Sequence, residues 1–154
     1  MNGSELAKLA QEQPELVANF NFSNVEAGDW EDLLEECPQY ADKCDKWDEM
    51  SFGRLLAFQP QLVKYCKLEN LDGSGWEALL GKCPEYADKC DWSKLEGWNW
   101  AMLLEKQPQF ADKCDKWNEI DGTHWAHLLK KYPEWASKCD ITKLSLSDIE
   151  FLKR

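Results

Sequence analysis

Hydrophobic positions recur along this chain with a period of about two dozen residues. The six prolines lie 22 to 25 residues apart, at Pro14, Pro38, Pro60, Pro84, Pro108 and Pro133. Eight positions before each proline stands a large apolar residue: Leu6, Trp30, Phe52, Trp76, Trp100 and Trp125. Two further apolar residues follow at five and four positions before the proline, as Leu103 and Leu104 do in the fifth copy. This spacing predicts a short helix with one apolar stripe that ends at the proline.

A second short helix is predicted after each proline, because proline suits the first helical turn. Its apolar positions in the fifth copy are Phe110, Ala111 and Cys114. An aspartate follows in four copies and is expected to cap a third, 3₁₀-like turn: Asp45, Asp91, Asp115 and Asp140. Small or capping residues are expected to precede the first helix, at Gly28-Asp29, Gly73-Ser74 and Gly122-Thr123.

A fixed period of this length is typical of a stacked-repeat solenoid. We therefore predict an all-α, right-handed helical-repeat solenoid of about six two-helix repeats plus a C-terminal capping helix. Residues 1–154 would form a single domain, with an N-terminal cap repeat (1–24), central repeats (25–140) and a C-terminal cap (141–154). The capping-box pattern from Ser147 to Glu150 is expected to open the last helix.

The repeated phrase Trp-x-x-Leu-Leu-x-x-x-Pro-x-aromatic-Ala-x-Lys-Cys-Asp-Trp resembles a tandem repeat of uncharacterised bacterial and phage proteins. Its period is also similar to that of the leucine-rich-repeat-variant solenoids. The resemblance covers residues 4–154 and is best from Trp76 to Ile120. It implies a repeat fold that acts by binding, and it carries no catalytic residues to transfer.

Negative charge is concentrated at the start of the chain. The net charge is −11, and residues 1–50 alone hold 13 acidic residues against three lysines. The candidate partner-binding acids are Asp29, Asp32, Glu35, Glu36, Asp48 and Glu49. Two interpretations stay open: a solvated face that aids solubility, or an anionic surface that selects a basic partner by charge.

The third copy differs from its neighbours. Its linker is three residues shorter, it has no acid from Met50 to Leu68, and it carries Arg54, Phe58 and Tyr65. The two aromatic residues occupy positions that hold mostly Lys or Glu in other copies. They are expected to be exposed, either as interface anchors or as fillers of a bend in the stack.

Trp98 does not belong to the repeated pattern and is expected in the linker before the fifth copy's first helix. Either it packs against Trp92 or it is an exposed binding anchor. The cysteines are expected in the core, without disulfides or zinc. His124 and His127 are interpreted as surface residues. We predict no catalytic residues, no metal site and no cofactor.

These features predict a non-enzymatic protein–protein interaction module. In its specific form, an acidic surface would block the basic nucleic-acid-binding site of a target such as a nuclease, in the manner of phage anti-CRISPR proteins. The alternative is a scaffold module with no inhibitory role. We expect a monomer or weak dimer without direct nucleic-acid or membrane binding. Seven cysteines without CxxC pairs and the lack of a signal-peptide pattern or a long apolar run predict a cytoplasmic location.

Overall fold

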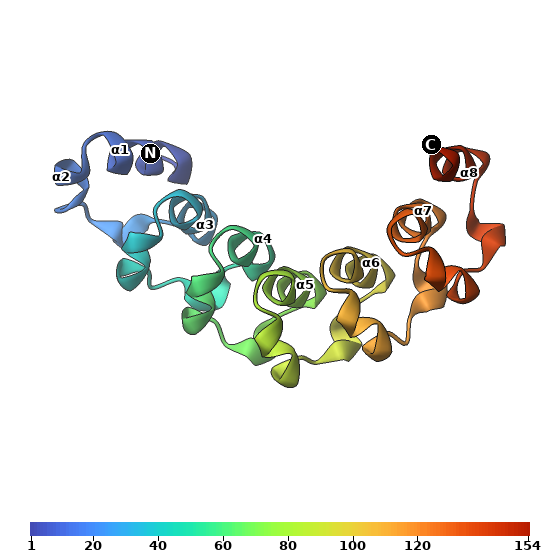
Figure 1. Cartoon of the computed structure of the whole chain (residues 1–154). Coiled ribbons are helices and arrows are strands. Elements are labelled where there is room, and N and C mark those ends of the chain that lie inside the picture. The colour runs from blue at the N-terminus through green and yellow to red at the C-terminus, as the bar shows by residue number, and fades with distance from the viewer. The chain divides into compact units, whose positions relative to one another are not determined.

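The computed structural model describes residues 1–154 and consists of helices and loops without any strand (Figure 1). The prediction of an all-α helical-repeat fold is confirmed. The chain divides into two units, Met1–Leu71 and Asp72–Arg154, which are described separately. No helix combines the length and the apolar character that crossing a bilayer requires.

Each unit repeats one pattern, an α-helix followed by two short helical segments. Unit 1 contains α1 (Gly3–Glu12), α2 (Pro14–Val17), η1 (Phe22–Asn24), α3 (Ala27–Glu36), η2 (Pro38–Lys43), η3 (Trp47–Glu49), α4 (Phe52–Phe58), η4 (Pro60–Tyr65) and η5 (Leu68–Asn70). Unit 2 contains α5 (Gly73–Lys82), η6 (Pro84–Lys89), η7 (Trp92–Lys94), α6 (Gly97–Lys106), η8 (Pro108–Lys113), η9 (Trp117–Glu119), α7 (Gly122–Lys131), η10 (Pro133–Lys138), η11 (Ile141–Lys143) and α8 (Leu146–Lys153). The η segments are 3₁₀ helices.

In each of the six repeats that contain a proline, the long helix ends just before the proline, as predicted. The residue before the proline lies outside the α region in every copy, for example Cys37 with φ −133° and ψ 69° and Gln107 with φ −131° and ψ 73°. The proline ring excludes the α conformation from that residue. The chain therefore turns sharply and starts a new segment at the proline.

The segment after the proline differs in type from the expected second α-helix. It is a 3₁₀ helix in five copies and a four-residue α-helix only at Pro14–Val17. The hydrogen bonds at the ends of η2 join residues three positions apart. The Tyr40 N–H, for example, donates to the Cys37 carbonyl. Each of these six-residue segments starts at a proline and is followed by a cysteine in an extended conformation. So short a segment can adopt the tighter winding of a 3₁₀ helix, which is common in short helices.

The long helices begin two to three residues earlier than predicted. Asp72 caps α5 by accepting from the Gly75 N–H at 2.8 Å, and Asp121 caps α7 by accepting from the His124 N–H at 2.8 Å. The pairs Gly28-Asp29, Gly73-Ser74 and Gly122-Thr123 thus lie inside helices. The last helix is capped by Ser145 with Asp148 as its capping-box partner, so the prediction of Ser147 was wrong by two residues.

The predicted aspartate caps of the third turn are confirmed in two copies and wrong in two. Asp91 accepts from the Ser93 N–H at 3.2 Å, and Asp140 accepts from the Thr142 N–H at 3.0 Å. In the other two copies a lysine is inserted after the aspartate. Lys46 and Lys116 then occupy the N-cap position, and neither makes a side-chain cap bond.

The core of unit 1 lies where α1, α3 and α4 pack side by side (Figure 1). Trp30, Leu33 and Leu34 of α3 are fully buried there, and the Phe22 ring stacks on the Trp30 ring at a centroid distance of 5.1 Å. Unit 2 repeats the arrangement with α5 to α8. The Trp92 ring stacks on Trp100, and the Trp117 ring stacks on Trp125. The repeated tryptophans are core residues, as predicted.

Glycine at the first helical position sets how closely the repeats of unit 2 approach one another. A Cβ atom added at Gly97 would lie closer than 3.0 Å to the Glu119 carbonyl oxygen, and one added at Gly122 would meet the Lys143 carbonyl oxygen in the same way. Each of these helix starts therefore rests against the backbone at the end of the second 3₁₀ segment that follows it, Glu119 of η9 or Lys143 of η11. Any side chain there pushes these two segments apart.

We expect Gly97→Ala to destabilise the protein by about 1–3 kcal/mol, because the new methyl group meets backbone that cannot rotate away. Gly28→Ala is the matched control, since an added Cβ there meets nothing within 4 Å. Alanine should stabilise that helix by roughly 0.5–1 kcal/mol. Urea denaturation followed by tryptophan fluorescence measures both changes. Equal effects of the two substitutions would contradict the proposed close approach.

Candidate interaction surface

The predicted acids of α3 contact the neighbouring helices of unit 1. Asp29 accepts from the Gly3 N–H at 2.8 Å. The Arg54 guanidinium lies 3.4 Å from Asp32 and 2.5 Å from Glu35. These carboxylates join α1, α3 and α4, so part of the acidic stripe serves the packing of the repeats.

Two further carboxylates of α3 also reach adjacent repeats. Glu36 is exposed and lies 3.5 Å from the Gln11 side-chain amide. Glu31 accepts from the Ser51 N–H at 2.6 Å, and Ser51 is the N-cap residue of α4, whose own side chain caps nothing. Sequence reasoning missed this role of Glu31. No local pattern signalled it, because Ser51 is itself a preferred N-cap residue.

The acids around η3 are the accessible ones. The Asp48 and Glu49 side chains are 74% and 60% exposed. Asp48 pairs with Lys67 at 3.0 Å, and Glu49 pairs with Lys46 at 3.7 Å. Asp45 is exposed as well. We call Asp45, Asp48 and Glu49 the η3 acids. Ion pairs at such exposed sites stabilise a protein by only about 0–1 kcal/mol, so they exchange readily with external charges.

The aromatic residues of copy three have different environments. Phe58 is 61% exposed, as predicted. Tyr65 is only partly exposed, which differs from the prediction, because its ring stacks on Trp47 at a centroid distance of 4.6 Å and an interplanar angle of 5°. Its hydroxyl donates to the Asp42 carboxylate, and this hydrogen bond raises the pKa of Tyr65.

Trp98 is exposed to 47% and lies in the first turn of α6 rather than in a linker. The ring that stacks on Trp92 belongs to Trp100, at a centroid distance of 5.3 Å. Of the two interpretations of Trp98, the structure therefore favours the exposed one. Trp98 borders a hollow of about 190 Å³ in unit 2, together with the buried Asn99, which helps to cap α6.

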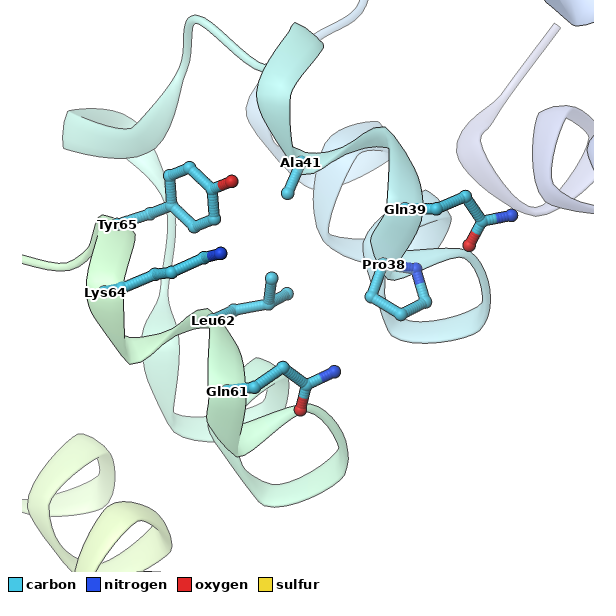
Figure 2. Close-up of a pocket in the computed structure, with 7 residues that line it drawn as sticks. All are labelled: Pro38, Gln39, Ala41, Gln61, Leu62, Lys64 and Tyr65. Atoms are coloured by element: carbon cyan, nitrogen blue, oxygen red, sulfur yellow. The ribbon is translucent and has the colours of Figure 1, made fainter.

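A shallow groove runs between η2 and η4 of unit 1 (Figure 2). Its volume is about 230 Å³, and it is lined by Pro38, Gln39, Ala41, Gln61, Leu62, Lys64 and Tyr65. The Lys64 ammonium lies 5.2 Å from the centroid of the Tyr65 ring. The groove combines an apolar floor with a cation, and Tyr65 forms its border with a second depression.

That second depression, which we call the aromatic hollow, has a volume of about 340 Å³. It is lined by Trp47, Asp48, Met50, Phe52, Tyr65, Lys67 and Asn70. Phe52 stands where the regular copies bury a tryptophan, and its ring is 6.1 Å from Trp47, against 5.3 Å for the Trp92–Trp100 pair. The smaller ring leaves the space. The ion pair of Asp48 and Lys67 borders it, so Tyr65, Asp48 and the aromatic hollow form one surface.

Burial keeps the cysteine thiols protonated. All seven cysteines are free. Burial is the main cause that raises the pKa of Cys66 and Cys114 to about 11 and that of Cys90 to about 12. Cys44 and Cys114 are buried, and Cys66, Cys90 and Cys139 are partly exposed, so the predicted core position is fully enclosed only in some copies.

The two histidines do not share a site. His124 pairs with its helix cap Asp121 at 2.9 Å, and His127 packs on the Phe151 ring at a centroid distance of 4.7 Å. The backbone hydrogen bond from His124 lowers the pKa of Asp121. Nowhere in the chain do three or more His, Cys, Asp or Glu side chains gather so that they could hold a metal ion.

The chain matches no protein-family model, and neither a curated protein nor a solved structure is significantly similar to it.

We expect the thiols of the folded protein to resist alkylation. At pH 8.5, a thiol with a pKa of about 11 has a thiolate fraction roughly 100-fold smaller than an ordinary cysteine with a pKa near 8.5. Brief treatment with iodoacetamide should label Cys90 and Cys114 slowly in buffer and rapidly in urea, as measured by mass spectrometry of peptides. Equally fast labelling of Cys90 in both solvents is the result that contradicts this expectation.

Proposed function

We propose that the chain is a non-enzymatic protein-binding module whose unit 1 docks on a basic protein surface. The observation that carries the proposal is the juxtaposition of the η3 acids with the aromatic hollow. Accessible charge speeds association and excludes wrong partners, while aromatic side chains supply the contact area that holds a complex together.

The distribution of charge supports unit 1 as the docking unit. Unit 1 holds 14 acidic and six basic residues, a net charge of −8, and unit 2 holds 15 acidic and 12 basic residues, a net charge of −3. A basic nucleic-acid-binding site is a suitable target, because such sites bind phosphates largely through electrostatics and a carboxylate array can compete for them. Inhibition of a nucleic-acid-binding protein is thus the specific form of the proposal.

The cytoplasm suits this function, since it keeps thiols reduced and all seven cysteines of the chain are unpaired. The sign of the charge disfavours direct binding of nucleic acid. Phe58, exposed on α4 one turn after Arg54, can add apolar contact area to the same interaction.

A scaffold role is the second candidate, and a specific observation favours it. Asp29, Asp32 and Glu35 all contact neighbouring helices of unit 1. On this interpretation the acidity of α3 serves the stacking of repeats and needs no partner. The two candidates differ in what they predict for the η3 acids, where Asp48 and Glu49 are held by exposed ion pairs with lysines.

Reversal of the η3 acids tests the proposed function. The triple variant Asp45→Lys, Asp48→Lys and Glu49→Lys should lose at least about tenfold in affinity for the partner that the unchanged chain captures from its host, because charge complementarity is lost. Asp88→Lys, Asp112→Lys and Glu134→Lys reverse three exposed acids of unit 2 and provide the matched control. Binding is measured by surface plasmon resonance at 50 and 300 mM salt.

The same experiment separates the candidates. Docking predicts capture that weakens with salt and with the η3 reversal but not with the control reversal. Displacement of DNA from the captured protein by the chain would support inhibition. Unchanged affinity of the η3 variant at both salt concentrations would rule out the proposed docking surface and favour the scaffold role.

A further inference from the structure

The aromatic hollow is bordered by an ion pair whose cation can be exchanged for another cation. The Lys67 ammonium lies 3.0 Å from the Asp48 carboxylate, and the two side chains are 61% and 74% exposed. Such a pair contributes little to stability, because water solvates both charges and long side chains lose entropy when they are held together. A cation from outside can therefore replace Lys67 at Asp48 without unfolding the repeat.

Cations also gather at the aromatic rings of these repeats. The Lys64 ammonium lies 5.2 Å from the centroid of Tyr65, a ring that lines the hollow. In unit 2 the Lys138 ammonium lies 5.0 Å from the centroid of Trp117, which occupies the same repeat position as Trp47. Ring faces attract cations electrostatically, and the effect increases where water is excluded. In copy three Tyr65 stands at the position of Lys138 and stacks on Trp47, so the cation over Trp117 has no counterpart over Trp47.

We propose that the aromatic hollow is a subsite for one arginine side chain of the basic partner. Asp48 pairs with the incoming guanidinium, and Lys67 is the internal competitor that it displaces. The inference rests on the proposed docking of unit 1 on a basic surface, and it names the contact that gives this docking its specificity.

Arginine fits the site better than other cations for three reasons. Its guanidinium is planar and weakly hydrated, so it packs against aromatic side chains such as Trp47 and Phe52. Its forked donors pair with a carboxylate in two-point fashion. The volume of about 340 Å³ accommodates a guanidinium with part of its stem, which is near the lower end of the range for small-ligand sites. The net charge of −8 on unit 1 supplies the matching long-range attraction.

The first test measures binding of a fluorescein-labelled nona-arginine peptide to the full chain by fluorescence anisotropy. Asp48→Asn should weaken binding at least fivefold, because it removes the carboxylate of the subsite. Glu49→Gln is the matched control, since it removes one charge from an exposed neighbour that does not line the hollow. It should weaken binding less than twofold. Circular dichroism checks that both variants keep their helical content.

The second test removes the competitor. Lys67→Ala should tighten binding of the same peptide about threefold, since Asp48 is then unpaired. Lys43→Ala removes an equal charge from an exposed lysine of η2 that does not line the hollow, and it should tighten binding less than 1.5-fold.

The outcomes distinguish the two proposals. If the unchanged chain binds nona-arginine but Asp48→Asn and Glu49→Gln weaken binding equally, the arginine subsite is wrong while docking on a basic surface stands. If the unchanged chain does not bind the peptide at 50 mM salt, both the subsite and the acidic docking surface are wrong. A selective loss in Asp48→Asn together with a selective gain in Lys67→Ala supports the subsite.

Discussion

The proline ring imposes the constraint on which the rest of this structure depends. It prevents the preceding residue from being helical, and this residue has nearly the same backbone angles at Cys37, Gln59, Cys83, Gln107 and Tyr132. Each long helix therefore ends with the same turn, and the six copies can have the same shape. Within each unit, the repeated shape then lets the large apolar residue and the two leucines of one long helix pack against the next copy, which short helices need for stability.

Polar contacts between repeats decide which charges remain available for function. Asp29, Glu31 and Glu35 satisfy backbone or guanidinium donors of adjacent elements in unit 1. A carboxylate held in this way loses conformational freedom, and its charge is partly compensated by its neighbour. Asp48 pairs with an exposed lysine, Lys67. Acidity in the sequence thus divides into a structural part on α3 and an accessible part around η3.

Sequence patterns predicted the elements of this fold well, because their causes are local. The apolar spacing and the pre-proline sterics act within a few residues, and the structure confirms both at Trp100 and Gln107. Helix starts were predicted less well. Asp45 looks like Asp91, but one inserted lysine moves it out of the capping position. The role of Gly97 depends on backbone 22 residues away, which no local pattern shows.

The candidate site was predicted only in outline for the same reason. Negative charge near Asp48 and an exposed Phe58 can be inferred from the sequence, since both follow from departures from the repeat. The contact of Tyr65 with Trp47 joins two copies. It could be foreseen only by knowing that the lysine position of one copy lies over the aromatic position of the copy before it.

Departure from the repeat also explains why the accessible surface lies where it does. Regular copies fill the space beside the third turn with a buried tryptophan, as Trp100 does against Trp92. Copy three replaces this tryptophan with Phe52 and shortens the linker before it, so packing against Trp47 is looser. Uniform repeats favour stability, because every interface is filled. Recognition needs a place that is not filled, and in unit 1 the irregular copy supplies one beside the acids that can attract a cation.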